Sequence, residues 1–109
     1  MISWTDFEKL DIRSGTILEV KDFPQARKPA YQLLIDFGPM GIKKSSAQIT
    51  HHYRKEELTG RQVVAVVNFP VKQIGPFFSE CLVLGVYDSQ NQVILLAPDK
   101  PVENGQRIG

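Results

Sequence analysis

The sequence of 109 residues contains one cysteine, no long apolar run and almost no net charge. A single cysteine, Cys81, excludes an internal disulfide framework. No segment approaches the roughly 18 to 20 apolar residues that cross a bilayer as a helix, so we expect no membrane insertion. The first residues lack the basic and apolar regions of a signal peptide, which indicates a cytoplasmic protein. At this length, residues 1–109 are predicted to form one domain.

The sequence also has little that enzyme chemistry requires. It contains neither a Gly-x-x-x-x-Gly-Lys phosphate loop nor a Gly-x-Ser-x-Gly nucleophile elbow. Cys81 lies in an apolar run, where a packed thiol is far more common than a nucleophile. His51 and His52 are adjacent and would point about 100° apart on a helix, which does not suit one shared metal ion. We therefore expect no enzyme activity, no cofactor and no metal site.

The net charge of +1 conceals an uneven distribution along the chain. Residues 27–72 carry eight basic side chains against three acidic ones, a local charge of +5, whereas the two flanks together carry −4. A basic segment of this kind is typical of a surface that binds a polyanion. It also arises by chance in small domains, so charge alone leaves the partner open.

Alternation of apolar and polar residues predicts strands at 12–21, 31–37, 42–48, 63–68, 78–87 and 93–97. The spacing of Thr5 and Glu8 is that of a capping box, which predicts a short helix over about 6–10 with Thr5 as its N-cap. The segment 49–58 lacks alternation and ends at Thr59-Gly60, so we expect one or two helical turns there.

The first strand carries a glycine, Gly15, which predicts a β-bulge or a close approach of another part of the chain. The alternation in this strand places Ile12, Leu18 and Val20 on one face. After the Asp88-Ser89-Gln90-Asn91 turn and the last strand, the tail is expected to be extended and partly strand-like.

This order of elements predicts an all-β protein with an OB-fold, a five-stranded barrel with a short helix between strands 3 and 4. Both ends of the chain would then be extensions of the barrel. Three segments, 63–67, 82–86 and 93–96, are apolar on both faces. A small barrel covers only one face of each strand, so a second copy of the chain is the simplest cover. We therefore expect a homodimer.

A polar pair, Ser79-Glu80, interrupts one of the most apolar stretches of the sequence. A carboxylate inside a buried strand costs free energy unless it is paired or lies at an opening. We therefore expect Asn68 and Ser79-Glu80, near the ends of a hairpin that spans 61–84, to belong to a functional surface.

The third predicted strand is unusually polar, with Lys43, Lys44, Ser46 and Gln48. Cations and small hydrogen-bonding side chains on a β-surface suit phosphates and exposed nucleotides. Arg54, just beyond this strand, adds a flat group that can stack on bases. A solvated edge strand kept soluble by lysines explains Lys43 and Lys44 equally well.

Several motifs, in this order and spacing, resemble the tRNA-binding OB-domain family. They are Leu10-Asp11-Ile12-Arg13-Ser14-Gly15-Thr16-Ile17, Ile35-Asp36-Phe37-Gly38, Leu58-Thr59-Gly60-Arg61, Asn68-Phe69 and Ser79-Glu80. Members occur at the ends of some methionyl- and phenylalanyl-tRNA synthetases, in synthetase-associated cofactors and as free-standing homodimers. The resemblance implies an OB barrel, a dimer formed through the terminal additions and a surface that binds tRNA or peptide.

Three further segments are similar to the free-standing CsaA group of that family, which is described as export-related chaperones. They are Phe7-Glu8-Lys9-Leu10-Asp11-Ile12-Arg13, Lys44-Ser45-Ser46-Ala47-Gln48-Ile49-Thr50 and Val64-Ala65-Val66-Val67-Asn68-Phe69-Pro70. The chain departs from the wider family at Arg27-Lys28-Pro29, at Gly75-Pro76 and at Cys81-Leu82. The last two replace a basic residue and a flexible methionine, which weakens the expected tRNA contact and raises the standing of peptide binding as the alternative.

The sequence therefore predicts a non-catalytic homodimer that binds tRNA by its folded shape and tolerates different sequences. The predicted tRNA-binding residues are Arg13, Lys43, Lys44, Ser46, Gln48, Arg54, Asn68, Lys72, Ser79 and Glu80. The alternative is an export-related chaperone that binds unfolded or precursor polypeptides through Phe77, Phe78 and Leu82. Docking onto a synthetase or another large protein is left open.

Overall fold

The computed structural model describes residues 1–109 and is mostly β-structure. In chain order its elements are α1 (Trp4–Glu8), β1 (Ile12–Asp22), β2 (Tyr31–Asp36), the 3-10 turn η1 (Gly38–Met40), β3 (Ile42–Ala47), α2 (Lys55–Leu58), β4 (Gln62–Val66), β5 (Lys72–Ile74), β6 (Phe77–Ser79), β7 (Leu82–Val83), β8 (Gly85–Tyr87) and β9 (Val93–Leu95). None of the helices is long and apolar enough to cross a bilayer.

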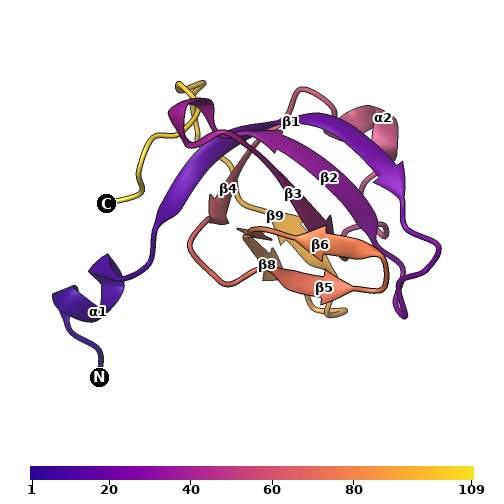
Figure 1. Cartoon of the computed structure of the whole chain (residues 1–109), viewed down its shortest axis with the longest axis horizontal. Coiled ribbons are helices and arrows are strands. Elements are labelled where there is room, and N and C mark those ends of the chain that lie inside the picture. Colours follow the sequence, from indigo (N-terminus) through magenta and orange to yellow (C-terminus); the bar gives the residue numbers. More distant parts are fainter.

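Five strands form one antiparallel sheet in the order β3-β2-β1-β4-β7. The sheet curls into a nearly closed barrel, and the hairpins β5–β6 and β8–β9 lie below β2 and β3 in the view of Figure 1. The single turn of α2 lies between β3 and β4 in the sequence. The predicted OB-type barrel with a short helix between strands 3 and 4 is therefore confirmed.

The barrel core is built on the alternation of β2. Leu33, Ile35 and Phe37 point inward and have at most 1% of their surface exposed, as do Ile17 of β1 and Val63 of β4. Burial of each such side chain stabilises the folded state by roughly 1.5–3 kcal/mol. The strand predicted at 31–37 is confirmed, and the alternation that predicted it is also the alternation of burial.

The first strand departs from the predicted alternation. Its pairing with β2 shifts register between Ile17 and Glu19, which marks a β-bulge. Ile17 and Val20 contact the barrel core, Leu18 is exposed, and Ile12 belongs to a separate cluster with Val64 and Val66 on the outer side of β1 and β4. The prediction that Ile12, Leu18 and Val20 share a face is wrong, because a bulge reverses the alternation beyond it.

The N-terminal helix begins earlier than predicted. Its N-cap is Ser3, whose side-chain oxygen accepts from the backbone N–H of Asp6, while the Asp6 carboxylate accepts from the N–H of Ser3. Thr5 therefore lies inside the helix, and the predicted cap at Thr5 is wrong. Asp6 completes the capping box as well as a glutamate would, so two overlapping cap signals compete in this segment.

The predicted strand at 78–87 is three short strands with three different partners. β6 pairs with β5, β7 with β4, and β8 with β9. The chain must change partner within a few residues, so one continuous strand is impossible. The turn before β9 and β9 itself were predicted correctly, and the tail pairs with β1 through a bridge between Arg13 and Arg107.

The close packing around Gly15 leaves no room for a side chain and gives a testable prediction. A Cβ atom at this position would lie 2.7 Å from Ile35 Cγ2 and 2.7 Å from the Phe37 ring, so β1 and β2 can approach only because the residue is glycine. Gly15→Ala should lower the free energy of unfolding by about 1–3 kcal/mol, the usual cost of overpacking. Urea denaturation measures this, and Gly109→Ala, with no atom within 4 Å, is the control that should leave stability unchanged.

Candidate functional site

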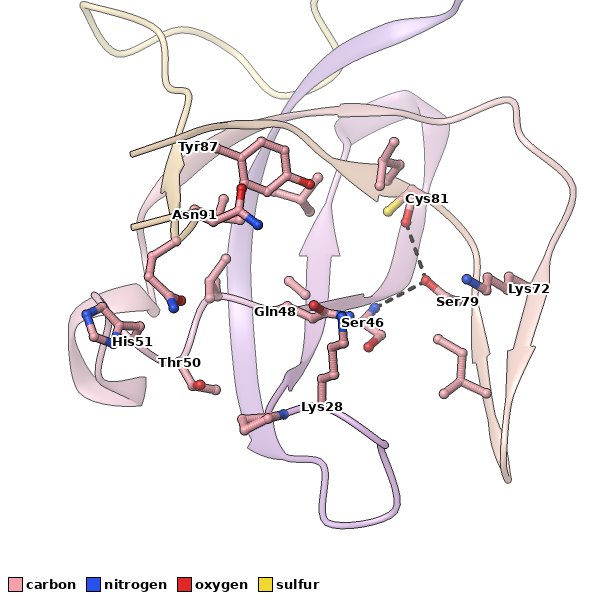
Figure 2. Close-up of a pocket in the computed structure, with 18 of the residues that line it drawn as sticks. Lys28, Ser46, Gln48, Thr50, His51, Lys72, Ser79, Cys81, Tyr87 and Asn91 are labelled. Carbon is pink, nitrogen blue, oxygen red and sulfur yellow. Dashed lines mark hydrogen bonds between the residues drawn. The ribbon is translucent and has the colours of Figure 1, made fainter. Parts of the chain in front are cut away.

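A groove of about 1060 Å³ opens on the side of the barrel where β3 and β7 separate. Ser46 and Gln48 lie along one wall, and Cys81 and Tyr87 lie along the other (Figure 2). Roughly 300–1,000 Å³ is typical of pockets for small ligands. This groove therefore has room for a segment of a larger ligand.

The charged lining of the groove is of one sign. Lys28 comes from the β1–β2 loop, Lys72 from β5 and His51 from the loop after β3, and no aspartate or glutamate lines the groove. Figure 2 shows Lys72 and His51 at opposite ends, with Lys28 between them below Ser46. The groove thus presents cations and apolar surface without a compensating carboxylate, and it favours anionic ligands.

The groove brings together part of the predicted site. Of the predicted tRNA-binding residues it is lined by Ser46, Gln48, Lys72 and Ser79, and of the predicted peptide-binding residues by Leu82. The lining residues that sequence reasoning missed include Lys28, Thr50, His51, Phe69, Tyr87 and Asn91. Lys28 belongs to the basic segment and could have been included. Tyr87 and Asn91 carried no sequence signal, because only folding brings the β8–β9 hairpin beside β3.

The polar pair Ser79-Glu80 fastens the barrel at the base of this groove. A Glu80 carboxylate oxygen accepts from the Lys44 backbone N–H at 2.9 Å, and the Glu80 N–H donates to the Lys44 carbonyl at 2.8 Å. Ser79 Oγ accepts from the Ser46 N–H at 3.1 Å, and Ser45 Oγ donates to the Cys81 carbonyl at 2.8 Å. The Glu80 and Ser79 side chains thus accept hydrogen bonds from two N–H groups of the β3 edge that no backbone carbonyl reaches.

Asn68 and Arg13 lie outside the groove lining and hold the chain ends. Asn68 Oδ1 accepts from the Asp11 N–H at 2.9 Å, and its Nδ2 donates to the Lys9 carbonyl at 2.8 Å. Arg13 is paired with Asp11 at 2.6 Å and donates to the Gly105 carbonyl at 3.0 Å. Both side chains thus make hydrogen bonds within the chain.

The other predicted basic residues surround the groove without lining it. The Lys44 ammonium group lies 5.5 Å from the centre of the Phe77 ring, a cation–π contact. Lys43 is half-buried on β3, and Arg54 is an exposed N-terminal neighbour of α2 whose Nε lies 3.3 Å from Glu57. These three basic side chains are therefore not part of the groove lining.

The three predicted peptide-binding residues do not form one surface. Phe77 is buried against Phe23, with ring centres 5.2 Å apart. Phe78 faces the opposite side of the β5–β6 hairpin, paired with Gln73 and exposed. Only Leu82 reaches the groove, because successive side chains of a strand alternate between its faces.

The β8–β9 wall of the groove is tied to the loop after β3. The Tyr53 hydroxyl accepts from the Leu95 N–H at 3.0 Å, and His52 Nε2 lies 2.7 Å from an Asp88 carboxylate oxygen. The backbone N–H of Gln92, together with His52, lowers the pKa of Asp88 below its usual value. Both ties hold Tyr87 and Asn91 opposite β3.

Comparison with known proteins places the whole barrel in one family. The model of the putative tRNA binding domain matches residues 12–107. The chain belongs to this family. Methionine–tRNA ligase of Nanoarchaeum equitans is 37% identical over 108 residues, which are 99% of this chain and 14% of the ligase. The chain thus spans about a seventh of the length of such a relative.

Two solved structures match this chain over its whole length. One is described as the chaperone CsaA of Bacillus anthracis, with a TM-score of 0.95 and 49% identity over 100% of this chain and 99% of that chain. The other is described as the CsaA chaperone protein of Picrophilus torridus, with a TM-score of 0.94 and 54% identity over the full length of both chains. The suspected resemblance is therefore confirmed.

Burial of Cys81 gives a prediction about pH. Only 6% of this residue is exposed, and desolvation raises the pKa of its thiol from the ordinary value of 9.0 to about 11. A raised pKa in the folded state means that the stabilisation is complete below pH 9 and is lost as the pH rises towards 11.

The free energy of unfolding should therefore fall more steeply between pH 9 and pH 11 for the natural protein than for Cys81→Ala. Urea titrations at several pH values measure the difference, and the subtraction removes the contribution of tyrosines and lysines that titrate in the same range. Parallel curves for the two proteins would contradict the assignment.

Proposed function

We propose that the protein is a non-catalytic tRNA-binding homodimer that selects tRNA by its folded shape and acts in the cytoplasm. The match of the tRNA-binding family model to residues 12–107 carries this proposal. The groove supports it, because its charged lining residues are all basic. Family members within methionine–tRNA ligases supply the same module to enzymes that act on tRNA.

Within this proposal the cations lie where phosphates would approach. Lys28 and Lys72 contact phosphates at the groove, while Lys43, Lys44 and Arg54 add to the attractive field around it. Ser46, Gln48 and Ser79 line the groove and offer hydrogen bonds to sugars or base edges. Three predicted residues act indirectly. Arg13 and Asn68 hold the chain ends by hydrogen bonds, and Glu80 joins its own segment to β3.

An uncovered apolar face supports the homodimer. In the β8–β9 hairpin Val86 is paired with Ile94, and Leu84 and Leu96 continue the same face. Val86, Ile94 and Leu96 are exposed, while Leu84 packs with Phe7 against the outer cluster of β1 and β4. The opposite face of the hairpin already covers the barrel core, so only another molecule can cover this one.

The N-terminal helix points to the same interface. α1 projects away from the barrel (Figure 1), and Met1, Ile2 and Trp4 are largely exposed. Phe7, at the end of α1, joins this helix to the cluster that contains Leu84. A partner seated on α1 and the β8–β9 hairpin would bury both surfaces, and the dimer would present two grooves to one folded RNA.

The dimer is tested by placing a charge on the uncovered face. Ile94→Glu should shift the protein from dimer to monomer in analytical ultracentrifugation at micromolar concentration, because a buried unpaired carboxylate opposes association. It should also weaken tRNA binding at least tenfold, since two linked grooves bind more tightly than one. Leu18→Glu, an equally apolar exposed position on β1, is the matched control. A natural protein that sediments as a monomer would refute the dimer.

The tRNA contact is tested through salt and charge. Binding of unmodified tRNA, measured by fluorescence anisotropy, should weaken by orders of magnitude between 50 and about 200 mM salt, because phosphate contacts release counterions. Lys72→Ala should weaken binding severalfold and reduce the salt slope by about one. Lys100→Ala, on the tail away from the groove, should change neither. Binding that ignores salt would contradict the proposal.

A second candidate function is chaperone-like binding of unfolded or precursor polypeptides. The two CsaA structures, which match this chain over its whole length, are described as chaperones. Apolar groups such as Phe69 and Leu82 are exposed at the groove and suit such a ligand. Because salt screens charges and leaves apolar burial intact, polypeptide binding should persist at salt concentrations that remove tRNA.

A further inference from the structure

The barrel of this protein has an opening in its hydrogen-bonded wall. β3 is the edge of the five-stranded sheet, and its bonds to the segment that follows β6 involve Lys44, Ser45 and Ser46 alone. Beyond Ser46 no bond joins β3 to β7. The groove begins at that point, with Ala47 and Gln48 on one side and Leu82 and Val83 on the other.

Some backbone groups at the end of β3 have no hydrogen-bond partner within the chain. The N–H groups of Lys44 and Ser46 point away from β2, towards Glu80 and Ser79. Backbone groups of alternate residues in a strand point to the same side. Gln48 is the first residue after β3, and continuing the alternation by one residue places its backbone groups and the carbonyl of Ser46 at the opening. The Gln48 backbone makes no hydrogen bond within the chain.

The opposite side carries a similar group. The Leu84 N–H donates to the Val64 carbonyl, and Ala65 lies opposite Val83 in the β4–β7 register. The alternation of an antiparallel pair then turns the backbone of Val83 away from β4, into the opening. Donors and acceptors thus stand on both sides of the groove, at the spacing of alternate strand residues.

Side chains around the opening are of two kinds. Ala47, Ile49 and Val93 make its floor, and Leu82 is exposed at its edge. Lys28, Lys72 and His51 stand around it without any carboxylate. These three basic residues form the rim of the opening. A bound ligand is therefore stabilised when its apolar groups lie on the floor and its negative charges lie near the rim.

We propose that an extended polypeptide segment with alternating apolar and acidic side chains binds in this groove by adding a strand to the free edge of β3. This proposal deepens the second candidate function and rests on it. A polypeptide in β-conformation offers a donor and an acceptor at every second residue, about 6.6–6.8 Å apart, which matches the repeat of Ser46 and Gln48. Its side chains then alternate between the apolar floor and the basic rim.

The same groups discriminate against a phosphate backbone in the depth of the groove. Phosphates only accept hydrogen bonds, whereas the carbonyl of Ser46 and the carbonyl of Gln48 also require donors. Bound tRNA would therefore contact the cations of the rim, and a polypeptide would occupy the opening beneath them. Main-chain pairing explains how such a site accepts many sequences, because the bonds depend on the backbone of the ligand.

The experiment removes one donor from the edge. Gln48→Pro deletes the free N–H, and Gln48→Ala retains it while deleting the same side chain. The probe is an acetylated, fluorescently labelled nonapeptide of alternating leucine and glutamate, measured by anisotropy at 50 and 300 mM salt. We expect Gln48→Pro to bind the peptide about tenfold more weakly than Gln48→Ala does, the upper range for one hydrogen bond.

A chemically modified peptide tests strand addition without any mutation of the protein. The same peptide, N-methylated at every second residue on the edge that would face β3, keeps its side chains and loses those donors. Its affinity for the natural protein should fall more than tenfold, whereas methylation of the opposite edge should have less effect. This comparison remains decisive if the far-UV circular dichroism of Gln48→Pro shows a disturbed barrel.

The outcomes separate this inference from the functions on which it rests. Equal binding by Gln48→Pro and Gln48→Ala, or indifference to N-methylation, overturns strand addition while polypeptide binding stands. Binding of tRNA without any binding of the peptide overturns the inference and the chaperone function together, and leaves tRNA binding intact. If Gln48→Pro binds both tRNA and the peptide more weakly than Gln48→Ala does, tRNA and polypeptide do not occupy separate parts of the groove, and that part of the inference is overturned.

Discussion

The seam between β3 and the segment Ser79–Cys81 is the contact on which the rest of the structure depends. Backbone pairing alone does not close the barrel there, because β3 and β7 belong to opposite edges of the sheet. A carboxylate and two hydroxyl groups supply the missing partners, so Lys44 and Ser46 are satisfied without a continuous strand. Closure over such a short distance leaves the remaining edge open, and that open edge forms one wall of the groove.

The position of the seam also sets the chemistry of the groove. Ser46 and Ala47 at the end of β3 line the groove together with Gln48, and the segments that fold over it bring lysines from the β1–β2 loop and from β5. Because the carboxylate of Glu80 is used on the seam, it does not line the groove or offset these cations. The same chain thus combines a carboxylate that is engaged at the seam with a groove whose charged residues are all basic.

Prediction succeeded where a signal was local and uninterrupted. The inner face of β2, the turn before β9 and the position of α2 followed from short patterns in the sequence. It failed where a neighbour in space intervened, as at the bulge after Ile17 and at the breaks in 78–87. Ser79, Lys72, Ser46 and Gln48 were predicted from the sequence and line the groove, while Tyr87 and Asn91 reach it only because folding brings the β8–β9 hairpin beside β3.

The sequence by itself determined the class of fold, the family and the presence of a polar interruption at Ser79-Glu80, because these depend on the order of residues along the chain. Only the tertiary structure decided what that interruption does. Asn68 and Glu80 have the polarity of ligand-binding residues, and the fold directs their hydrogen bonds to backbone groups of the chain itself. A side chain can bind a ligand only with groups that its own fold leaves free, and which groups are free depends on every neighbour brought there by folding.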